Sequence, residues 1–152
     1  MKTKQLDDVD KEILKQLRKN CRRSYRELAK VINLSPAALI ERIKKLEERG
    51  IVTQYVAVLN YQKLGFEYMG IINVNITKGA LLEVQKKIAG FPNVATVYDI
   101  TGEYDSAVVT ICKNRHELSA LIKKINNIPQ VQKTNTNVIL NVIKEMREFD
   151  AV

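Results

Sequence analysis

Residues 24–49 contain two consecutive helix-start signals, and this stretch constrains the fold more than any other part of the chain. Ser24 is followed three residues later by Glu27, the capping-box pattern that satisfies two backbone N–H groups at a helix start. Ser35 and Pro36 have the form of an N-cap followed by proline at the first helical position. Apolar residues recur at helical spacing after each signal. We therefore predict two short helices joined by a tight turn.

The second predicted helix has the features of a DNA-recognition helix. In a helix-turn-helix the second helix enters the major groove, and its N-terminal residues approach the base edges. Here that end carries small residues, so a close approach is possible. From Arg18 to Arg49 there are ten basic and four acidic residues, a net charge of +6. A small helical bundle with a solvated face is the alternative, and the charge imbalance favours DNA binding.

We predict two kinds of DNA contact in this segment. The residues expected in or beside the major groove are Ser35, Ala37, Ala38, Glu41 and Arg42. The cationic residues expected at phosphates are Arg22, Arg23, Arg26, Lys44, Lys45 and Arg49, and Ser24 at the first helix start completes the predicted DNA-binding set.

The segments on either side extend this motif to a winged helix-turn-helix domain. Apolar residues at helical spacing predict a preceding helix over residues 6–20. Residues 51–59 are rich in β-forming side chains and predict the strand of a wing. We predict a DNA-binding domain over 1–59, a hinge over 60–65 and a second domain over 66–152.

The second domain contains an internal repeat. Residues 86–94 align with residues 123–131, and each copy ends a helix on an apolar residue before proline and begins a strand at valine. We predict a strand before and after each helix, which gives the order β-α-β-β-α-β. This is the ferredoxin-like arrangement, so the whole chain is assigned to the α+β class. The predicted strands span residues 68–77, 94–101, 105–112 and 131–143.

Both faces of this predicted sheet are apolar. Neighbouring apolar residues such as Ile71 and Ile72, or Val108 and Val109, face opposite sides of a strand. Both helices cover one face in this topology, so the other face lacks cover within the chain. We therefore expect a homodimer that forms through the second domain.

Composition excludes several classes of protein. The net charge is +8, of which residues 1–60 hold +6 (fourteen basic, eight acidic) and residues 61–152 hold +2 (eleven basic, nine acidic). No apolar run approaches the roughly 18 residues of a membrane span, and the N-terminus lacks the apolar core of a signal peptide. Cys21 and Cys112 are far apart, with only His116 as a possible companion, so we expect reduced, partly buried thiols and no zinc site. The expected location is the cytoplasm.

An enzyme and an RNA-binding domain are the other functions considered. The chain has a single histidine and none of the nucleophile, metal or phosphate-loop patterns that catalysis requires, so we expect no enzyme activity and no cofactor. RNA-recognition domains share the βαββαβ order but stack bases on aromatic residues of the third strand. Residues 105–111 offer neither an aromatic nor a basic side chain there.

Three motifs together resemble the Lrp/AsnC, or feast/famine, family of prokaryotic transcription regulators. They are LDDVDKEIL at 6–14, the run at 24–52 and TGEYD at 101–105. The resemblance implies a DNA-binding domain joined to a ligand-sensing domain that dimerises and often assembles further, commonly into octamers. It also implies a small effector, typically an amino acid, bound between dimers near the TGEYD loop. Glu103 stands where the family usually has aspartate, and Ala37-Ala38 stand where many relatives have polar residues.

An amino-acid site at this loop is chemically reasonable. Asp105 can accept from an ammonium group, while the backbone near Gly102 and the hydroxyls of Thr134 and Thr136 can donate to a carboxylate. A tight hairpin turn needs the same glycine and aspartate, which is the structural alternative. The predicted effector-binding residues are Thr101, Gly102, Glu103, Tyr104, Asp105, Thr134, Asn135 and Thr136.

These features predict a sequence-specific transcription regulator whose assembly or DNA binding responds to a small effector, with an amino acid as the expected ligand. Its expected partners are double-stranded DNA and further copies of itself. The alternative is a nucleoid-type architectural protein that binds DNA with little sequence or effector specificity, and the two functions use the same residues.

Overall fold

The computed structural model describes residues 5–145, which form two compact units. The first unit extends to Val58 and the second spans Leu59–Glu145. The predicted arrangement of a helix-turn-helix followed by an α+β domain is confirmed.

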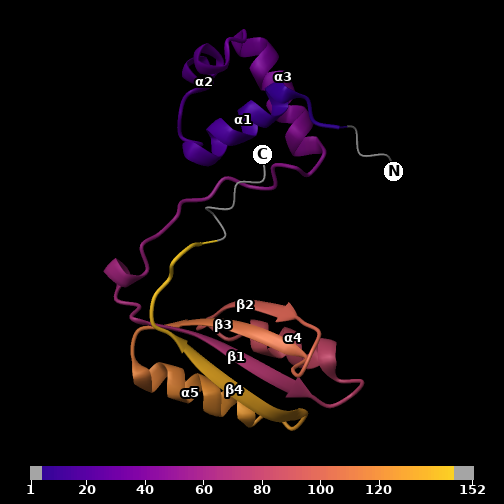
Figure 1. The fold of residues 1–152 in the computed structure, drawn as a ribbon, viewed down its shortest axis with the longest axis vertical. Coiled ribbons are helices and arrows are strands. Elements are labelled where there is room, and N and C mark those ends of the chain that lie inside the picture. The colour runs from indigo at the N-terminus through magenta and orange to yellow at the C-terminus, as the bar shows by residue number, and fades with distance from the viewer. Residues whose placement is uncertain (1–4, 146–152) are drawn as a thin grey trace. The chain divides into compact units, whose positions relative to one another are not determined.

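Three helices make up the N-terminal unit: α1 (Asp8–Lys19), α2 (Tyr25–Ile32) and α3 (Pro36–Glu48) (Figure 1). Each begins at a side-chain cap, because Asp7 and Ser35 accept N–H groups three residues ahead and Ser24 forms the full predicted capping box. Each helix turns its apolar stripe inward. The buried core consists of Ile13, Leu14, Leu17, Leu28, Ala29, Leu39, Ile43 and Leu46.

The turn between α2 and α3 depends on Asn33. This residue has φ +59° and ψ +47°, the left-handed region that asparagine tolerates better than most residues. Its N–H and that of Leu34 donate to carbonyls at the end of α2. The short turn therefore fixes the angle at which α3 leaves α2.

The strand predicted over residues 51–59 is wrong. The N–H groups of Ile51 and Val52 donate to the Leu46 carbonyl and close the end of α3. Residues 53–60 then continue without regular secondary structure. A β-strand needs a neighbour for its ladder hydrogen bonds, and residues 5–145 supply none to this segment.

The segment that we predicted as a hinge contains a short helical turn. The 3₁₀ helix η1 (Gln62–Leu64) ends at Gly65, whose φ of +83° favours glycine. Tyr61 and Phe66 bracket the turn with their rings edge to face, 6.0 Å between centroids. The turn gives residues 60–65 a defined local conformation.

The C-terminal unit has the predicted βαββαβ order. Its elements are β1 (Tyr68–Ile76), α4 (Leu81–Ala89), β2 (Val94–Asp99), β3 (Ser106–Cys112), α5 (Arg115–Asn126) and β4 (Val131–Ile139). The strands form one antiparallel sheet in the order β2-β3-β1-β4, and Figure 1 shows α4 and α5 on the same side of it. The strand predicted over 131–143 ends at Ile139.

The internal repeat is visible in backbone hydrogen bonds. After α4, Phe91 donates to Ile88 and Val94 donates to Phe91. After α5, Ile128 and Val131 make the same two bonds 37 positions later, to Ile125 and Ile128. The repeated sequence therefore encodes a repeated helix-to-strand turn.

The two faces of the sheet have different environments. The face toward the helices is sealed by buried residues such as Ile72, Val74 and Val108. The opposite, open face has no covering element from the second unit. By the strand register it carries Met69, Ile71, Asn73, Thr96, Tyr98, Ala107, Val109, Ile111, Asn135, Asn137 and Ile139.

The two cysteines lie in different environments. Cys112 is fully buried in the core of the second unit, and burial raises the pKa of its thiol. Cys21 is exposed, so the expectation of two partly buried thiols is wrong for both.

Candidate DNA-binding surface and ligand cavity

Helix α3 presents small side chains at its N-terminal end. Leu39, Ile43 and Leu46 hold one side of the helix in the core. Ala37 is exposed and Ala38 is half-buried, while the Ser35 hydroxyl accepts the N–H of Ala38 at 3.2 Å. The end of α3 can therefore approach a surface closely with its backbone and methyl groups.

Arg42, which we predicted beside the major groove, is engaged within the unit. One nitrogen of its guanidinium lies 2.8 Å from Asp7 Oδ2 and 2.7 Å from Asp10 Oδ1, at the start of α1. The hydrogen bond from Arg42 holds the pKa of Asp7 below its usual range. This geometry gives Arg42 a structural role, because it clasps α3 to α1.

The charged residues on the outward side of α3 form pairs. Lys45 lies 2.6 Å from Glu41, and Lys44 lies 3.8 Å from Glu48. The hydrogen bond from Lys45 lowers the pKa of Glu41. These four charges cancel, so α3 itself adds little net attraction for a polyanion.

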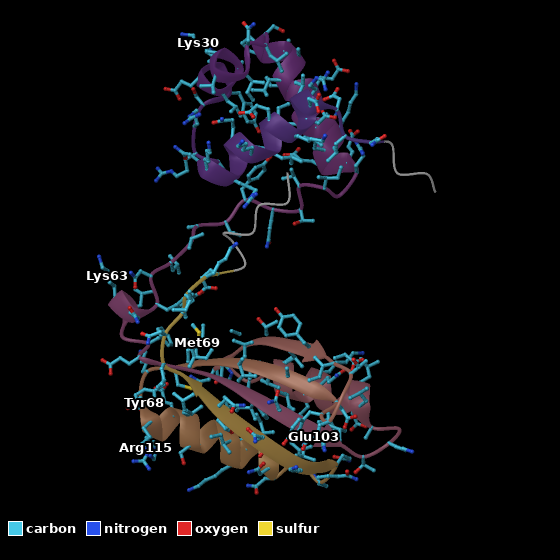
Figure 2. All side chains as sticks on the ribbon, in the orientation of Figure 1. Lys30, Lys63, Tyr68, Met69, Glu103 and Arg115 are labelled. Carbon is cyan, nitrogen blue, oxygen red and sulfur yellow. The ribbon has the colours of Figure 1, made fainter. Side chains whose placement is uncertain are left out.

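The cationic residues before and within α2 supply a more exposed positive surface. Arg22, Arg26 and Lys30 are exposed, and Figure 2 labels Lys30 on α2. Arg23 donates to Gln16 Oε1 at 3.1 Å and is partly directed toward α1. The remaining predicted cation, Arg49, is the exposed C-cap of α3.

Ser24 is occupied by its capping role. Its hydroxyl donates to Glu27 Oε2 at 2.8 Å and accepts the Glu27 N–H at 3.3 Å. The hydroxyl bond to Oε2, together with the Ser24 N–H that donates to the same oxygen at 3.1 Å, lowers the pKa of Glu27. Ser24 therefore sets the start of α2, beside the exposed arginines.

In the second unit, Asp105 ties the 101–105 loop to β1. Its carboxylate accepts the N–H of Ile76 at 2.7 Å, where β1 and β4 shift register. Its own N–H donates to the Val74 carbonyl at 3.1 Å, and its carbonyl accepts from Ile100. One carboxylate oxygen thus has a structural role, although it binds the neighbouring strand β1 and not the hairpin turn itself.

A cavity of about 460 Å³ lies beside this loop. The register shift at Asn75 and Ile76 is a bulge, and Thr77 directly follows the end of β1. Figure 2 labels Glu103 at the same end of the sheet. The Asn75 Oδ1 atom is buried without a hydrogen-bond partner among the described residues. The lining residues are Asn75, Ile76, Thr77, Lys78, Glu103, Asp105 and Gln132.

Lys133 adds a positive charge near this cavity. Its ammonium lies 3.1 Å from Glu103 and 5.3 Å from the centroid of the Tyr104 ring. The hydrogen bond to Glu103 raises the pKa of Lys133. The region therefore combines carboxylates, amides and ammonium groups, as recognition of a small zwitterion requires.

The predicted effector residues are only partly brought together. Glu103 and Asp105 line the cavity, while Thr101 and Gly102 are exposed in the same loop. On β4, Thr134 and Thr136 share the helix-facing side of the sheet, and neither lines the cavity. Thr134 Oγ1 bonds Asn126 Oδ1 at 2.8 Å, whereas Asn135 lies on the open face and accepts from Asn137.

Sequence reasoning missed four polar residues of the cavity. They are Asn75, Thr77, Lys78 and Gln132. A usable signal existed, since the first and third strands of this topology are antiparallel neighbours. That pairing places the end of β1 beside the start of β3, and therefore beside Asp105.

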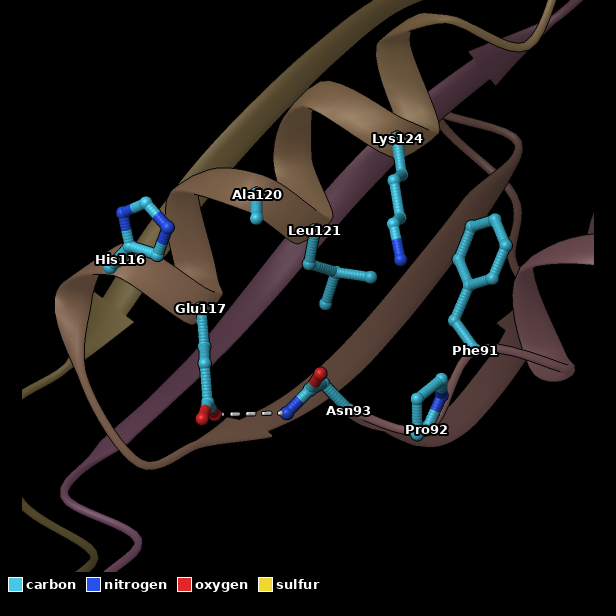
Figure 3. Close-up of a pocket in the computed structure, with 8 residues that line it drawn as sticks. All are labelled: Phe91, Pro92, Asn93, His116, Glu117, Ala120, Leu121 and Lys124. Atoms are coloured by element: carbon cyan, nitrogen blue, oxygen red, sulfur yellow. Dashed lines mark hydrogen bonds between the residues drawn. The ribbon is translucent and has the colours of Figure 1, made fainter.

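A second, smaller cavity of about 210 Å³ lies between α5 and the turn after α4. Figure 3 shows Glu117 of α5 pointing toward Asn93 and Lys124 pointing toward Phe91. Glu117 accepts from the Asn93 amide at 3.3 Å and from the Lys113 N–H at 2.9 Å. These bonds join α5 to the start of β2, so the polar groups here already have a structural role.

Two further observations concern residues 5–145. No helix there is long and apolar enough to cross a membrane. Nor does the same part of the chain bring three or more histidine, cysteine, aspartate or glutamate side chains together as metal ligands.

Comparison with known families accounts for both units. The profile of the Lrp/AsnC ligand-binding domain matches residues 69–149, and that of a winged helix-turn-helix DNA-binding domain matches residues 6–53. The chain belongs to the Lrp/AsnC family. The predicted family is thereby confirmed.

Relatives of this Lrp/AsnC protein align over nearly their full length. An uncharacterised HTH-type transcriptional regulator of Pyrococcus abyssi is 40% identical over 92% of this chain and 95% of its own. The HTH-type transcriptional regulator FL11 of Pyrococcus furiosus is 35% identical over 95% of each chain. This Lrp/AsnC protein is a transcriptional regulator with a helix-turn-helix and a ligand-binding domain.

Solved structures show the same fold. A Neisseria meningitidis transcriptional regulator in complex with L-methionine has a TM-score of 0.87 at 28% identity and covers 93% of this chain and 94% of its own. LrpC of B. subtilis has a TM-score of 0.85 at 30% identity, with 93% and 99% covered.

Proposed function

We propose that this Lrp/AsnC regulator binds a free amino acid in the cavity beside the 101–105 loop and that the bound ligand changes its occupancy of DNA. The observation that carries the proposal is the cavity itself, which lies in the ligand-binding domain and is lined by the predicted residues Glu103 and Asp105. The Neisseria relative in complex with L-methionine supports an amino acid as the class of ligand.

The lining residues can hold both ends of an α-amino acid. The free oxygen of Asp105 and the side chain of Glu103 accept from an ammonium group, and the unpartnered Asn75 oxygen is a third acceptor. Lys78 offers a positive charge to the carboxylate. Thr101, Gly102 and Tyr104 belong to the same loop, and we place Thr134, Asn135 and Thr136 around the ligand rather than in first contact with it. We propose a binding role for these residues and no catalytic role.

On DNA, we propose that α3 enters the major groove with Ser35, Ala37, Ala38 and Glu41 at the base edges. Arg22, Arg26 and Arg49 contact phosphates. Arg23, Lys44 and Lys45 join them by leaving Gln16, Glu48 and Glu41, respectively. Ser24 and Arg42 support this surface through their capping and clasping contacts. The protein acts in the cytoplasm, where it meets double-stranded DNA.

The apolar open face of the sheet supports assembly through the second unit. Residues such as Ile71 and Val109 are half-buried on this face, which no element of the second unit covers. We propose a homodimer through this face and further assembly toward octamers, with residues 60–65 as the hinge between the two domains. Two recognition helices then read half-sites about one helical turn apart.

Effector control requires a difference in ligand affinity between two states of the protein. A ligand shifts DNA occupancy only if it binds the DNA-competent assembly more or less tightly than the other assembly. Asp105 is bonded to the bulge of β1, so a ligand that binds Asp105 would lie beside a central strand of the sheet. Binding can thereby influence the open face through β1.

Isothermal titration calorimetry against the twenty amino acids tests the sensing proposal. Asp105→Asn is the informative variant, because its amide oxygen still accepts the Ile76 N–H while the charge is lost. We expect it to weaken the effector by about tenfold or more and to leave effector-free DNA binding unchanged. Asp99→Asn, at the end of β2 and outside the cavity, is the matched control. If no amino acid binds the parent protein, the sensing proposal fails.

An architectural role is the second candidate function. The paired charges on α3 and the internal contacts of Arg42 leave few charged groups free to read bases. Measurements of affinity on a selected site and on random DNA, at several salt concentrations, separate the two functions. A ratio near one would identify the architectural protein.

A further inference from the structure

Ile40 is a large apolar residue on the outward side of α3. Its side chain is 47% exposed, although its neighbour Leu39 is completely buried. Ala37 lies three residues earlier and Lys44 four residues later, so all three share one side of the helix. Isoleucine here contributes little to the core of the unit.

The charges around Ile40 are already paired. Glu41 bonds Lys45, and Lys44 pairs with Glu48. Ala37 and Ile40 therefore form a small apolar patch on a neutral stretch of the recognition helix. Such a patch cannot gain from phosphates, which are charged and strongly hydrated.

The major groove offers one apolar group to such a patch. Of the four bases only thymine presents a methyl group there, whereas the other base edges present hydrogen-bond donors and acceptors. An isoleucine placed against a donor or acceptor would remove its water without replacing the hydrogen bond, which carries a free-energy cost. Ile40 can therefore attract thymine and disfavour the other bases.

We propose that Ile40 is a specificity-determining residue that contacts the C5-methyl group of a thymine in each half-site. Ala37 supplies a second methyl group on the same side. This inference rests on the DNA-binding role of α3. It adds a base preference to the predicted groove residues, among which Ile40 was not included.

The test uses DNA in which single methyl groups are removed. A preferred site is first selected from random duplexes with the full-length parent protein. Each thymine is then replaced in turn by deoxyuridine, which lacks the methyl group and keeps the same base pairing. We expect one uracil position per half-site to weaken binding by about three- to tenfold, as expected for one buried methyl group.

The Ile40→Ala variant should lose this sensitivity. It should bind thymine and uracil duplexes within about twofold of each other, while a thermal melt close to that of the parent shows that it folds. Val31→Ala removes a branched side chain of similar exposure (54%, against 47% for Ile40) from α2 and should keep the parent's response to uracil. The double comparison isolates the contact between one side chain and one methyl group.

Two results would overturn the inference. One is a selected site at which no uracil substitution changes the affinity. The other is an Ile40→Ala protein that remains as sensitive to uracil as the parent. Failure of the parent protein to bind DNA at all would instead refute the function of the first unit.

Discussion

The two units of this protein expose surfaces of different chemical character. The N-terminal unit closes its small core with three capped helices and an arginine clasp, and it exposes arginines and lysines on its outside. The C-terminal unit buries a larger core between its sheet and two helices, and it leaves one face of the sheet uncovered. A positively charged surface attracts a polyanion, whereas an exposed apolar surface favours association with another apolar protein surface. In the function proposed above, the first unit binds DNA and the second mediates self-association.

A charge on the open sheet face gives the largest expected effect on this comparison. Ile71→Glu places a carboxylate in the middle of the apolar face, so we expect a monomer in analytical ultracentrifugation. DNA affinity should fall by about 100-fold or more, since the two recognition helices no longer bind as one unit. Leu82→Glu, on the exposed side of α4, is the matched control. A dimer that survives Ile71→Glu would place the association surface elsewhere.

Removal of cations from the first unit should have the next largest effect. The double variant Arg22→Ala, Arg26→Ala is expected to weaken binding about tenfold on every DNA sequence. The slope of log affinity against log salt should fall by about one per lost phosphate contact. Fluorescence anisotropy at several salt concentrations measures both. The double variant Lys86→Ala, Lys87→Ala, in the second unit, should change neither quantity. If it weakened DNA binding as much, DNA binding could not be attributed to the first unit alone.

Loss of the clasp should reduce stability more than recognition. Arg42→Met keeps the apolar stem of the side chain but removes the guanidinium that binds Asp7 and Asp10. We expect the thermal midpoint to fall by about 4–8 °C, because two partly exposed ion pairs contribute modestly to a small domain. Sequence preference measured well below that midpoint should be retained. A changed base preference in the folded variant would instead show that Arg42 contacts bases in the major groove.

The smallest expected effect is a pH dependence at Asp7. The Asp7→Asn variant keeps the helix cap but loses the charge that Arg42 binds. Because the pKa of Asp7 is lowered in the folded state, its charge stabilises the fold above the unfolded-state pKa, about 3.9. This stabilisation is lost as the pH falls through the lowered folded-state pKa. We expect a midpoint about 1–4 °C below the parent at pH 7, with the difference closing below about pH 4. Scanning calorimetry across this range measures it.

The features predictable from the sequence are local ones. The capping box at Ser24, the N-cap at Ser35 and the repeated turns before Pro92 and Pro129 each depend on residues within a few positions of one another. Hydrogen bonds and sterics within one turn determine such structures. The positions of the helices in both units could therefore be predicted from the sequence.

The features that were missed depend on distant partners. Arg42 meets Asp7 across 35 positions, and no periodicity signals that contact. The segment after α3 has strand composition but lacks a neighbouring strand, so composition alone misled the prediction of the wing. The cavity beside the 101–105 loop combines the end of β1, that loop and Gln132, which only the order of the strands brings together.

The strand order means that neither repeat of the C-terminal unit can form a sheet alone. Its two repeats, β1-α4-β2 and β3-α5-β4, interleave, because β3 of the second repeat lies between the two strands of the first. In one repeat alone, the two strands would be separated by the position of a missing strand, so no backbone hydrogen bonds could join them. A chain with only one repeat could complete this sheet only by pairing with a second copy of itself. The covalent link between the repeats therefore replaces an association between two chains by an intramolecular contact.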